Sequence, residues 1–320
     1  MSIFPRPIIV ISKCLGFAPC RYDVGMIQFP LVESMKPYVD FIDICPECEI
    51  GLGVPREPIR IVFKDKKRLI QPATGLDFTD KMVAFGKSYL EKLEDFDGFI
   101  LKSKSPSCGI GTTKVFQDSF SKEYLHHHEN GFFVDAVLRS FPDLPVIDEK
   151  HVDDPLLRDY FLTRVFALSS FREASFCGKM QTLNSLVEYH TKNKFLFMAY
   201  DKQLMTCMGN IVANRGNFPV ENAYENYLSL LLQVLSKQAG TGSTINALMH
   251  AFGYLSRNLS ASEKFNFMQK LQKYREDGSV IFELRKWFIS KAEEFSADYL
   301  LKQTLFCPYP PELSGSLRIV

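Results

Sequence analysis

Residues 7–12 read Pro7-Ile8-Ile9-Val10-Ile11-Ser12, a short apolar run rich in β-branched residues. Such a run, flanked by residues that interrupt regular structure, predicts a buried β-strand. Three further runs have the same character, at residues 39–44, 97–102 and 144–148. Apolar residues at helical spacing lie between them, over residues 79–93 and 131–141. Strands that alternate with helices predict an α/β domain with a doubly wound parallel sheet.

The strand pattern stops near residues 151–155, and the chain beyond carries apolar residues at helical spacing. We therefore expect two domains, an α/β domain over residues 1–155 and an all-α domain over residues 156–320. Helices of the second domain are predicted over 157–173, 182–190, 192–208, 223–237, 241–258, 260–277 and 281–301. In the first domain, the helix over 79–93 is expected to present an apolar stripe of Met82, Val83, Phe85, Tyr89 and Leu93.

The bulk composition is that of an ordinary soluble protein. The 320 residues are 46% hydrophobic and 23% charged, with a net charge of +1. The part before Phe171 has 21 Lys and Arg against 24 Asp and Glu, and the rest has 17 against 13. This balance excludes a strongly basic nucleic-acid binder but leaves room for a local basic patch. The sequence start does not resemble a signal peptide, and no apolar stretch approaches membrane-spanning length. The eight cysteines show no compact disulfide spacing, so we expect a reducing, cytoplasmic environment.

Three cysteines lie where predicted strands end. They are Cys14, Cys45 and Cys108, the last within Ser105-Pro106-Ser107-Cys108-Gly109. Because parallel strands of an open sheet end at one edge, where ligand sites gather, we expect these thiols to meet. Three soft thiolates, with no fourth cysteine in a comparable setting, predict an iron–sulfur cluster with one open iron.

Other metal and redox interpretations stay open. Cys45-Pro46-Glu47-Cys48 is a Cys-x-x-Cys motif, which also suits a redox dithiol or a structural zinc site. The residues that follow it, 50–55, predict a loop. Cys20 and Cys48 are unassigned, and the cysteines of the helical part are expected to pack only, namely Cys177, Cys207 and Cys307. His126-His127-His128 resembles a metal-binding tract, but we interpret it as a solvated loop.

Polar residues beside these cysteines are candidates for proton transfer and for substrate binding. Glu47 lies two residues after Cys45, and a carboxyl group in a partly dry site is suited to move a proton. The alternative is a structural carboxylate paired with Arg21 or Arg56. The hydroxyl groups of Ser105 and Ser107 are placed to hold a carbonyl-like substrate, although serine is also common in turns.

Four motifs in order resemble the thiouracil desulfidase family. They are Ile11-Ser12-x-Cys14-Leu15-Gly16, Arg21-Tyr22-Asp23, Cys45-Pro46-Glu47 with Gly51-Leu52-Gly53-Val54-Pro55-Arg56, and Leu101-Lys102 with Ser105-Pro106-Ser107-Cys108-Gly109. The resemblance covers about residues 5–150. Residues 160–310 resemble the helical YbgA-type domain, most clearly over 187–199. Val24 departs from the family pattern, which usually has glycine there, and Cys48 stands where we expect an aliphatic residue.

The resemblance implies a [4Fe–4S] cluster held by Cys14, Cys45 and Cys108, and catalytic roles for Glu47 and Ser105. We expect Arg21, Arg56 and Ser107 to bind the substrate. The implied reaction is a non-redox, hydrolytic removal of sulfur from a thiolated pyrimidine. The fusion of the two domains resembles proteins that act on 4-thiouridine in tRNA. A desulfidase of free thiouracil and a non-enzymatic iron–sulfur sensor remain the alternatives.

Binding of tRNA would use phosphate contacts and base stacking. Phe17 and Tyr22 are the stacking candidates, and core packing is the competing interpretation. The candidate phosphate contacts are basic residues of the helical domain, namely Lys192, Lys194, Arg215, Lys264, Lys270, Lys273, Arg275, Arg285 and Lys286.

Overall fold

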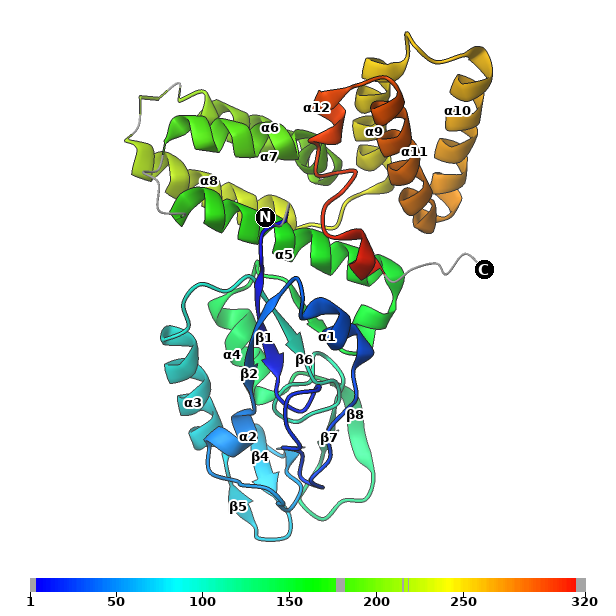
Figure 1. The fold of residues 1–320 in the computed structure, drawn as a ribbon. Helices are drawn as coiled ribbons and strands as arrows, with labels where there is room; N and C mark the ends of the chain where they lie inside the picture. The colour runs from blue at the N-terminus through cyan, green and yellow to red at the C-terminus, as the bar shows by residue number, and fades with distance from the viewer. Residues whose placement is uncertain (1–3, 177–181, 215, 218, 315–320) are drawn as a thin grey trace. The chain divides into compact units, whose positions relative to one another are not determined.

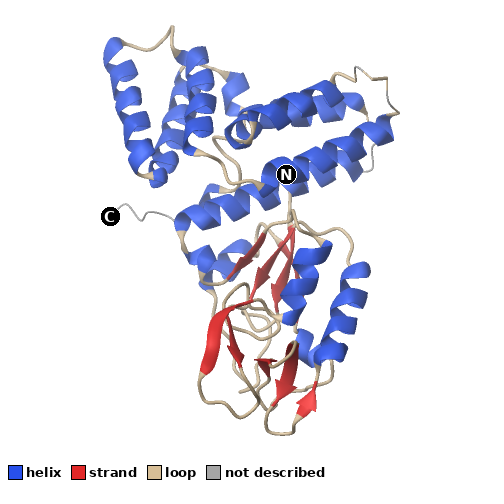
Figure 2. Cartoon of the chain, turned by 180° about the vertical axis from the view of Figure 1, so that it is seen from behind, coloured by secondary structure: helices blue, strands red, loops and turns tan. Residues whose placement is uncertain are grey.

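The computed structural model describes residues 4–176, 182–214, 216–217 and 219–314. The chain divides into two compact units, one formed by Arg6–Phe161 and the other mainly by the residues from Leu162 onward (Figure 1). The first unit combines strands and helices, whereas the described part of the second contains helices and no strand (Figure 2). The predicted fold class, a parallel α/β sheet followed by an all-α region, is confirmed.

A four-stranded parallel sheet forms the frame of the first unit. Its strands lie in the order β2-β1-β6-β9, and each neighbouring pair is parallel. The bounds are β1 Ile8–Ser12, β2 Asp40–Ile44, β6 Gly98–Leu101 and β9 Val146–Asp148. These four strands coincide with the four predicted runs. The carboxyl ends of β1, β2 and β6 therefore lie at one edge of the sheet, as a ligand site in this class of fold requires.

A second sheet of five strands in the same unit was not predicted. Its order is β5-β4-β3-β7-β8, with β3 and β7 parallel and the other pairs antiparallel. The bounds are β3 Arg60–Phe63, β4 Lys67–Gln71, β5 Leu76–Asp77, β7 Thr113–Phe116 and β8 Tyr124–Glu129. The strands are short and partly charged, so their hydrophobic pattern is weak. The predicted loop at residues 126–128 is wrong, because these exposed histidines lie in β8 and pair with β7.

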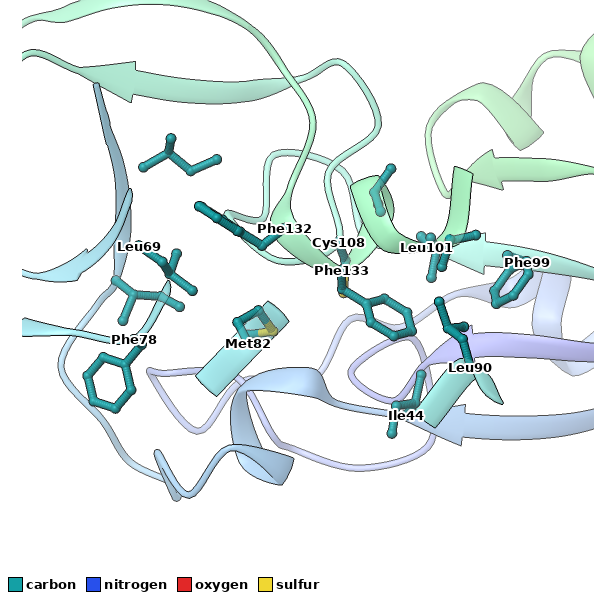
Figure 3. Packing of buried hydrophobic residues seen from close by; sticks show 14 of the residues in the cluster. Ile44, Leu69, Phe78, Met82, Leu90, Phe99, Leu101, Cys108, Phe132 and Phe133 are labelled. Atoms are coloured by element: carbon teal, nitrogen blue, oxygen red, sulfur yellow. The ribbon is translucent and has the colours of Figure 1, made fainter. Parts of the chain in front are cut away.

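One buried apolar cluster joins both sheets to helices α3 (Thr79–Glu91) and α4 (Phe132–Ser140) (Figure 3). The predicted apolar stripe of α3 is partly wrong. Its buried face consists of Met82, Gly86 and Leu90, whereas Val83 is 47% exposed. A side chain at position 86 would crowd α4, since its Cβ would lie 3.1 Å from that of Ala136. The close packing of α3 against α4 thus decides which face of α3 is buried. Hydrophobicity alone does not reveal this contact.

The remaining helices include two short ones in the first unit, α1 Pro30–Met35 and α2 Pro46–Glu49. Helix α5, Pro155–Phe176, runs across the division between the units. The others are α6 Leu183–Tyr200, α7 Lys202–Val212, α8 Val220–Ser236, α9 Thr241–Leu255, α10 Ala261–Glu276, α11 Ile281–Glu294 and α12 Asp298–Leu301. Among the helices within the described ranges, none has both the length and the apolar character to cross a membrane.

Two predicted helix boundaries are wrong for identifiable reasons. The predicted break near residue 191 lies instead at Asp201, whose carboxylate accepts hydrogen bonds from the backbone N–H groups of Gln203 and Leu204 and so caps α7. The helix predicted over 281–301 divides into α11 and α12 at Ser296, which has a left-handed backbone with φ of 51°. The prediction that Cys207 packs is also wrong, because its side chain is exposed. Cys177 lies outside the described residues.

Candidate functional site

The carboxyl edge of the parallel sheet borders a cavity of about 580 Å³. Cys14, Cys45 and Cys108 all line it, and so does Cys20. Cys14 lies two residues after β1, Cys45 directly follows β2, and the loop after β6 leads to Cys108. The structure therefore brings together the three cysteines singled out in the sequence, although up to 94 positions separate them.

Cys20 and Cys48 belong to the same neighbourhood. The Sγ atoms of Cys45 and Cys48 donate to the backbone carbonyl of Cys20 at 3.8 and 3.9 Å. Hydrogen bonding with the Cys14 thiol raises the pKa of Cys20 to about 11. Burial raises the pKa of Cys108 to about 12 and that of Cys48 to about 11. Five thiols thus lie in this part of the first unit.

The loop before Cys108 is held by its own serine. The Ser105 hydroxyl accepts hydrogen bonds from the backbone N–H groups of Ser107 and Cys108 at 3.2 and 3.1 Å. The start of α4 fastens the same loop, since the N–H groups of Phe132 and Phe133 donate to the carbonyls of Pro106 and Ser107, each at 3.0 Å. The loop is therefore a rigid support for the cysteine rather than a mobile segment.

Gly131, the residue before α4, allows this contact. A Cβ atom at position 131 would lie 2.3 Å from the carbonyl carbon and oxygen of Ser107 and 2.8 Å from the backbone nitrogen of Cys108. Because these are backbone atoms, no side-chain rotation relieves the clash. We expect Gly131→Ala to lower the free energy of unfolding by roughly 2–3 kcal/mol.

Urea unfolding of the full chain measures this effect. Gly253→Ala is the matched control, because a Cβ at position 253 in α9 meets nothing within 4 Å. In a helix interior alanine is more favourable than glycine, so the control should be neutral or stabilising. Equal unfolding midpoints for Gly131→Ala and the unaltered chain would contradict the predicted clash.

Glu47 lines the cavity and uses both carboxylate oxygens. Oε2 accepts hydrogen bonds from Nε and Nη2 of Arg56 at 2.9 and 2.6 Å, while Oε1 accepts one from the Ser107 hydroxyl at 3.1 Å. The Arg56 side chain is 4% exposed and the Glu47 side chain 14%. Arg56 also donates to the carbonyls of Cys20 and Gly53. The pairing with Arg56, one of the alternatives considered for Glu47, is therefore present, and it fixes the carboxylate beside Cys45.

Of the other two residues predicted to bind substrate, Arg21 lines the cavity and Ser107 does not. Arg21 lines the cavity and forms an ion pair with Asp23 at 3.2 Å. Ser107 is fully buried and its hydroxyl is directed to Glu47; it is not among the described residues that line the cavity.

Tyr22 lines the cavity and is 45% exposed, whereas Phe17 packs edge-on against Phe41. Of the two stacking candidates, Tyr22 is therefore the one within reach of a cavity ligand.

Val24, which stands where the family usually has glycine, has a backbone conformation that favours glycine. Its φ is 59°, in the left-handed region that a β-branched residue occupies at a cost of roughly 1–2 kcal/mol. Glycine removes this cost but loses about 0.5–1 kcal/mol of additional chain entropy on folding. We therefore expect Val24→Gly to stabilise the chain by roughly 0.5–1 kcal/mol, net of these two terms. Thermal unfolding tests this, with Val24→Ala as the control that keeps Cβ, and a lower melting temperature for Val24→Gly would count against the strain.

Several cavity residues escaped the sequence analysis. Lys104 precedes Ser105 directly, and Lys102 belongs to the same motif but was assigned no role; Arg60, Lys114 and Phe116 come from the second sheet. The position of the two lysines beside a recognised motif was a usable signal. The residues of β3 and β7 lie beside no recognised motif, and the sheet that holds them was not predicted.

The fold and the cavity define an α/β protein with a cysteine-lined ligand site at the carboxyl edge of a parallel sheet. Residues 9–149 match the family model described as 2-thiouracil desulfurase, and residues 194–310 match one described as a protein of unknown function, DUF1722. The chain therefore joins a segment of the 2-thiouracil desulfurase type to a helical segment of the DUF1722 type, and the resemblance to the two families is confirmed.

Known proteins resemble each part separately. The uncharacterized protein YbbK of Bacillus subtilis is 27% identical over 157 residues, which are 47% of this chain and 100% of YbbK. The uncharacterized protein YbgA of Escherichia coli is 26% identical over 118 residues, which are 37% of this chain and 69% of YbgA. A solved structure, the [4Fe-4S]-dependent thiouracil desulfidase TudS, is 23% identical with a TM-score of 0.36, covering 47% of this chain and 95% of TudS.

Proposed function

We propose that this chain is an iron–sulfur-dependent desulfidase that removes sulfur from a thiolated pyrimidine, namely 4-thiouridine in tRNA, and releases uridine and sulfide. The observation that carries the proposal is the convergence of Cys14, Cys45 and Cys108 in one cavity with Glu47 beside them. The match of residues 9–149 to the 2-thiouracil desulfurase model supports the same chemistry.

The donor set suits a [4Fe–4S] cluster held by Cys14, Cys45 and Cys108. Thiolates are the ligands that such clusters take, and each binds a different iron atom. Cluster ligands are for that reason spaced more widely than the ligands of one ion. Consistently, the described residues contain no group of three or more His, Cys, Asp or Glu arranged for a single metal ion. Cys20 and Cys48 are then neighbours of the cluster.

A cluster held by Cys14, Cys45 and Cys108 would supply a Lewis acid for the soft sulfur of the substrate and would so polarise the C=S bond. The overall reaction consumes one water and exchanges C=S for C=O with release of hydrogen sulfide, so no electrons are transferred. Glu47 accepts a proton from the attacking water at Oε1, which receives one hydrogen bond, from the Ser107 hydroxyl, whereas Oε2 receives two from Arg56. Ser107 and Arg56 position the carboxylate, Ser105 lies at the cavity wall to orient the ring or the water, and Arg21 contributes to substrate binding.

The tRNA context rests on the fused helical segment. Of its predicted phosphate contacts, Arg285 is buried and donates from Nε to the carbonyl of Leu305, and Lys270 pairs with Glu283 at 2.8 Å. Burial makes Arg285 unsuited to bind phosphate, whereas the ion pair of Lys270 is partly exposed; Arg215 lies outside the described residues. The remaining basic residues of the proposed set are Lys192, Lys194, Lys264, Lys273, Arg275 and Lys286.

An anaerobic assay of the reconstituted full chain with 4-thiouridine-containing tRNA tests the proposal. We expect loss of thiouridine absorbance together with sulfide release, and a rate that falls with salt because phosphate contacts release counterions. Turnover of free thiouracil with no activity on tRNA would favour the small-base enzyme instead. A loaded cluster without turnover of either substrate would favour the sensor.

A further inference from the structure

Ser12 ends strand β1 and takes no part in the chemistry proposed above. Its side chain borders the cavity, although the residue is only 2% exposed. A hydroxyl group buried to this degree needs hydrogen-bond partners, because its removal from water otherwise costs free energy. The partners of Ser12 therefore indicate what the residue contributes.

The first partner uses the Ser12 hydroxyl as an acceptor. The backbone N–H of Lys102, the residue after β6, donates to Oγ of Ser12 at 2.9 Å. The parallel register of β1 with β6 ends with Ile11 opposite Ile100. The Ser12 side chain therefore continues the contact between the two strands just beyond their last paired residues. A serine hydroxyl that accepts in this way still has one hydrogen to donate.

The second partner is the thiol of Cys108. Burial raises the pKa of this thiol to about 12, and hydrogen bonds with the Ser12 and Ser105 hydroxyls oppose the rise. A hydrogen bond that lowers the pKa of a thiol is one that is donated to the thiolate. Two hydroxyl groups, one at the end of β1 and one in the cysteine loop, thus converge on the sulfur of a proposed cluster ligand.

The two hydroxyls differ in what holds them. Ser105 belongs to the loop itself, where it accepts from the backbone N–H groups of Ser107 and Cys108, and it is proposed to orient the ring or the water. Ser12 belongs to the central part of the parallel sheet and is held by the N–H of Lys102. Its position therefore does not depend on the loop or on a bound substrate, which suits a permanent donor to the sulfur.

A hydrogen bond to a ligand acts on the metal through that ligand. Donation to a thiolate sulfur withdraws electron density from the iron that the sulfur binds, and hydrogen bonds of this kind raise the reduction potential of iron–sulfur clusters. The same withdrawal makes the metal a stronger Lewis acid, which is the property that polarisation of a C=S bond requires.

We propose that Ser12 is a positioning residue that donates a hydrogen bond to the Cys108 thiolate and thereby increases the Lewis acidity of the proposed cluster. The inference rests on the proposed function, because it takes Cys108 as a cluster ligand. It assigns to the end of β1 a second contribution to the site, beside the thiol of Cys14.

A matched pair of variants isolates the hydroxyl group. Ser12→Thr and Ser12→Val have nearly the same shape, and only threonine keeps the hydroxyl. The reduction potential of the cluster, measured in the reconstituted full chain by a redox titration followed by EPR, should shift to a more negative value in Ser12→Val and return in Ser12→Thr. Sulfide release should fall roughly tenfold or more in Ser12→Val and recover in Ser12→Thr.

Two further variants serve as controls. Ser12→Ala adds no bulk, so it should reproduce the shift of Ser12→Val if the lost hydroxyl and not crowding is the cause. Ser34→Ala removes an exposed hydroxyl on α1 and should leave the potential unchanged.

An unchanged potential in Ser12→Ala and Ser12→Val, at the iron content of the unaltered chain, would overturn the inference. A lower melting temperature alone would then make Ser12 a purely structural partner of the Lys102 backbone. The potential is read without turnover, so absence of sulfide release from every thiolated pyrimidine would refute the proposed function and leave the result for Ser12 standing.

Discussion

Replacing Cys45 by alanine is expected to abolish both iron loading and sulfide release. Cys45 lies in the middle of the thiol neighbourhood, beside Cys20 and Cys48, and follows directly the end of β2. With only three protein ligands proposed for the cluster, loss of one leaves two irons without a thiolate. We expect turnover to fall by at least about 10²-fold, the upper range found when groups that orient metal ligands are removed. Cys14→Ala and Cys108→Ala should behave alike.

Iron and acid-labile sulfide per chain, measured after anaerobic reconstitution, check this prediction separately from activity. Cys207→Ala is the matched control, since that thiol is exposed on α7 in the other unit. Cys20→Ala and Cys48→Ala distinguish ligands from neighbours, because each should retain iron. Full iron content in Cys45→Ala, combined with loss of iron in Cys48→Ala, would reassign the ligand within the Cys-x-x-Cys motif.

The second large effect is expected for Glu47→Gln, which should reduce kcat by about 10²–10⁴-fold and leave the iron content unchanged. Glutamine keeps the shape of the side chain and an acceptor for the Ser107 hydroxyl, but it does not take the proton from water. Single-turnover sulfide release with reconstituted protein measures the step. Glu57→Gln is a suitable control, as an exposed carboxylate ten residues away in the sequence.

A loss of activity in Glu47→Gln has a competing structural cause that a second variant separates. The Arg56 side chain is 4% exposed, so removing its partner leaves a buried charge unpaired and should also lower the melting temperature. In Glu47→Gln/Arg56→Gln both members are neutral, and we expect part of the stability to return. Recovery of turnover together with stability would show that Glu47 acts only through the fold and does not carry the proton.

The parts of the fold that were predictable are those with strong local patterns. The runs of β1 and β6 are apolar because these strands lie inside the sheet and are buried, whereas β2, at the edge of the sheet, alternates polar and apolar residues and is partly exposed. Parallel strands necessarily end at one edge. The convergence of Cys14, Cys45 and Cys108 follows from that geometry alone. The start of helix α10 was equally predictable from the sequence, since Ser260 and Glu263 have the spacing of a capping box and form one in the structure.

The unpredicted parts depend on contacts between distant segments. Strands β3 and β7 pair although 54 positions separate Ile61 from its partner Val115, and neither strand carries a strong pattern. Arg60 and Lys114 were therefore absent from the predicted site. Ser107 was expected to contact substrate, but the approach of α4 at Gly131 turns the loop so that its hydroxyl is buried against Glu47. Packing of this kind is not encoded in any single stretch of sequence.

The spread of the cysteines along the chain also sets an order of events in the cell. Cys14 and Cys108 come together only after β1 and β6 have paired, so a nascent chain offers no assembled binding site. The pairing of β1 with β6, whose residues lie in the buried apolar core, thus precedes assembly of the three thiols into one site. A cluster of the proposed kind would therefore bind at a pocket that folding has already shaped, and not along the unfolded chain.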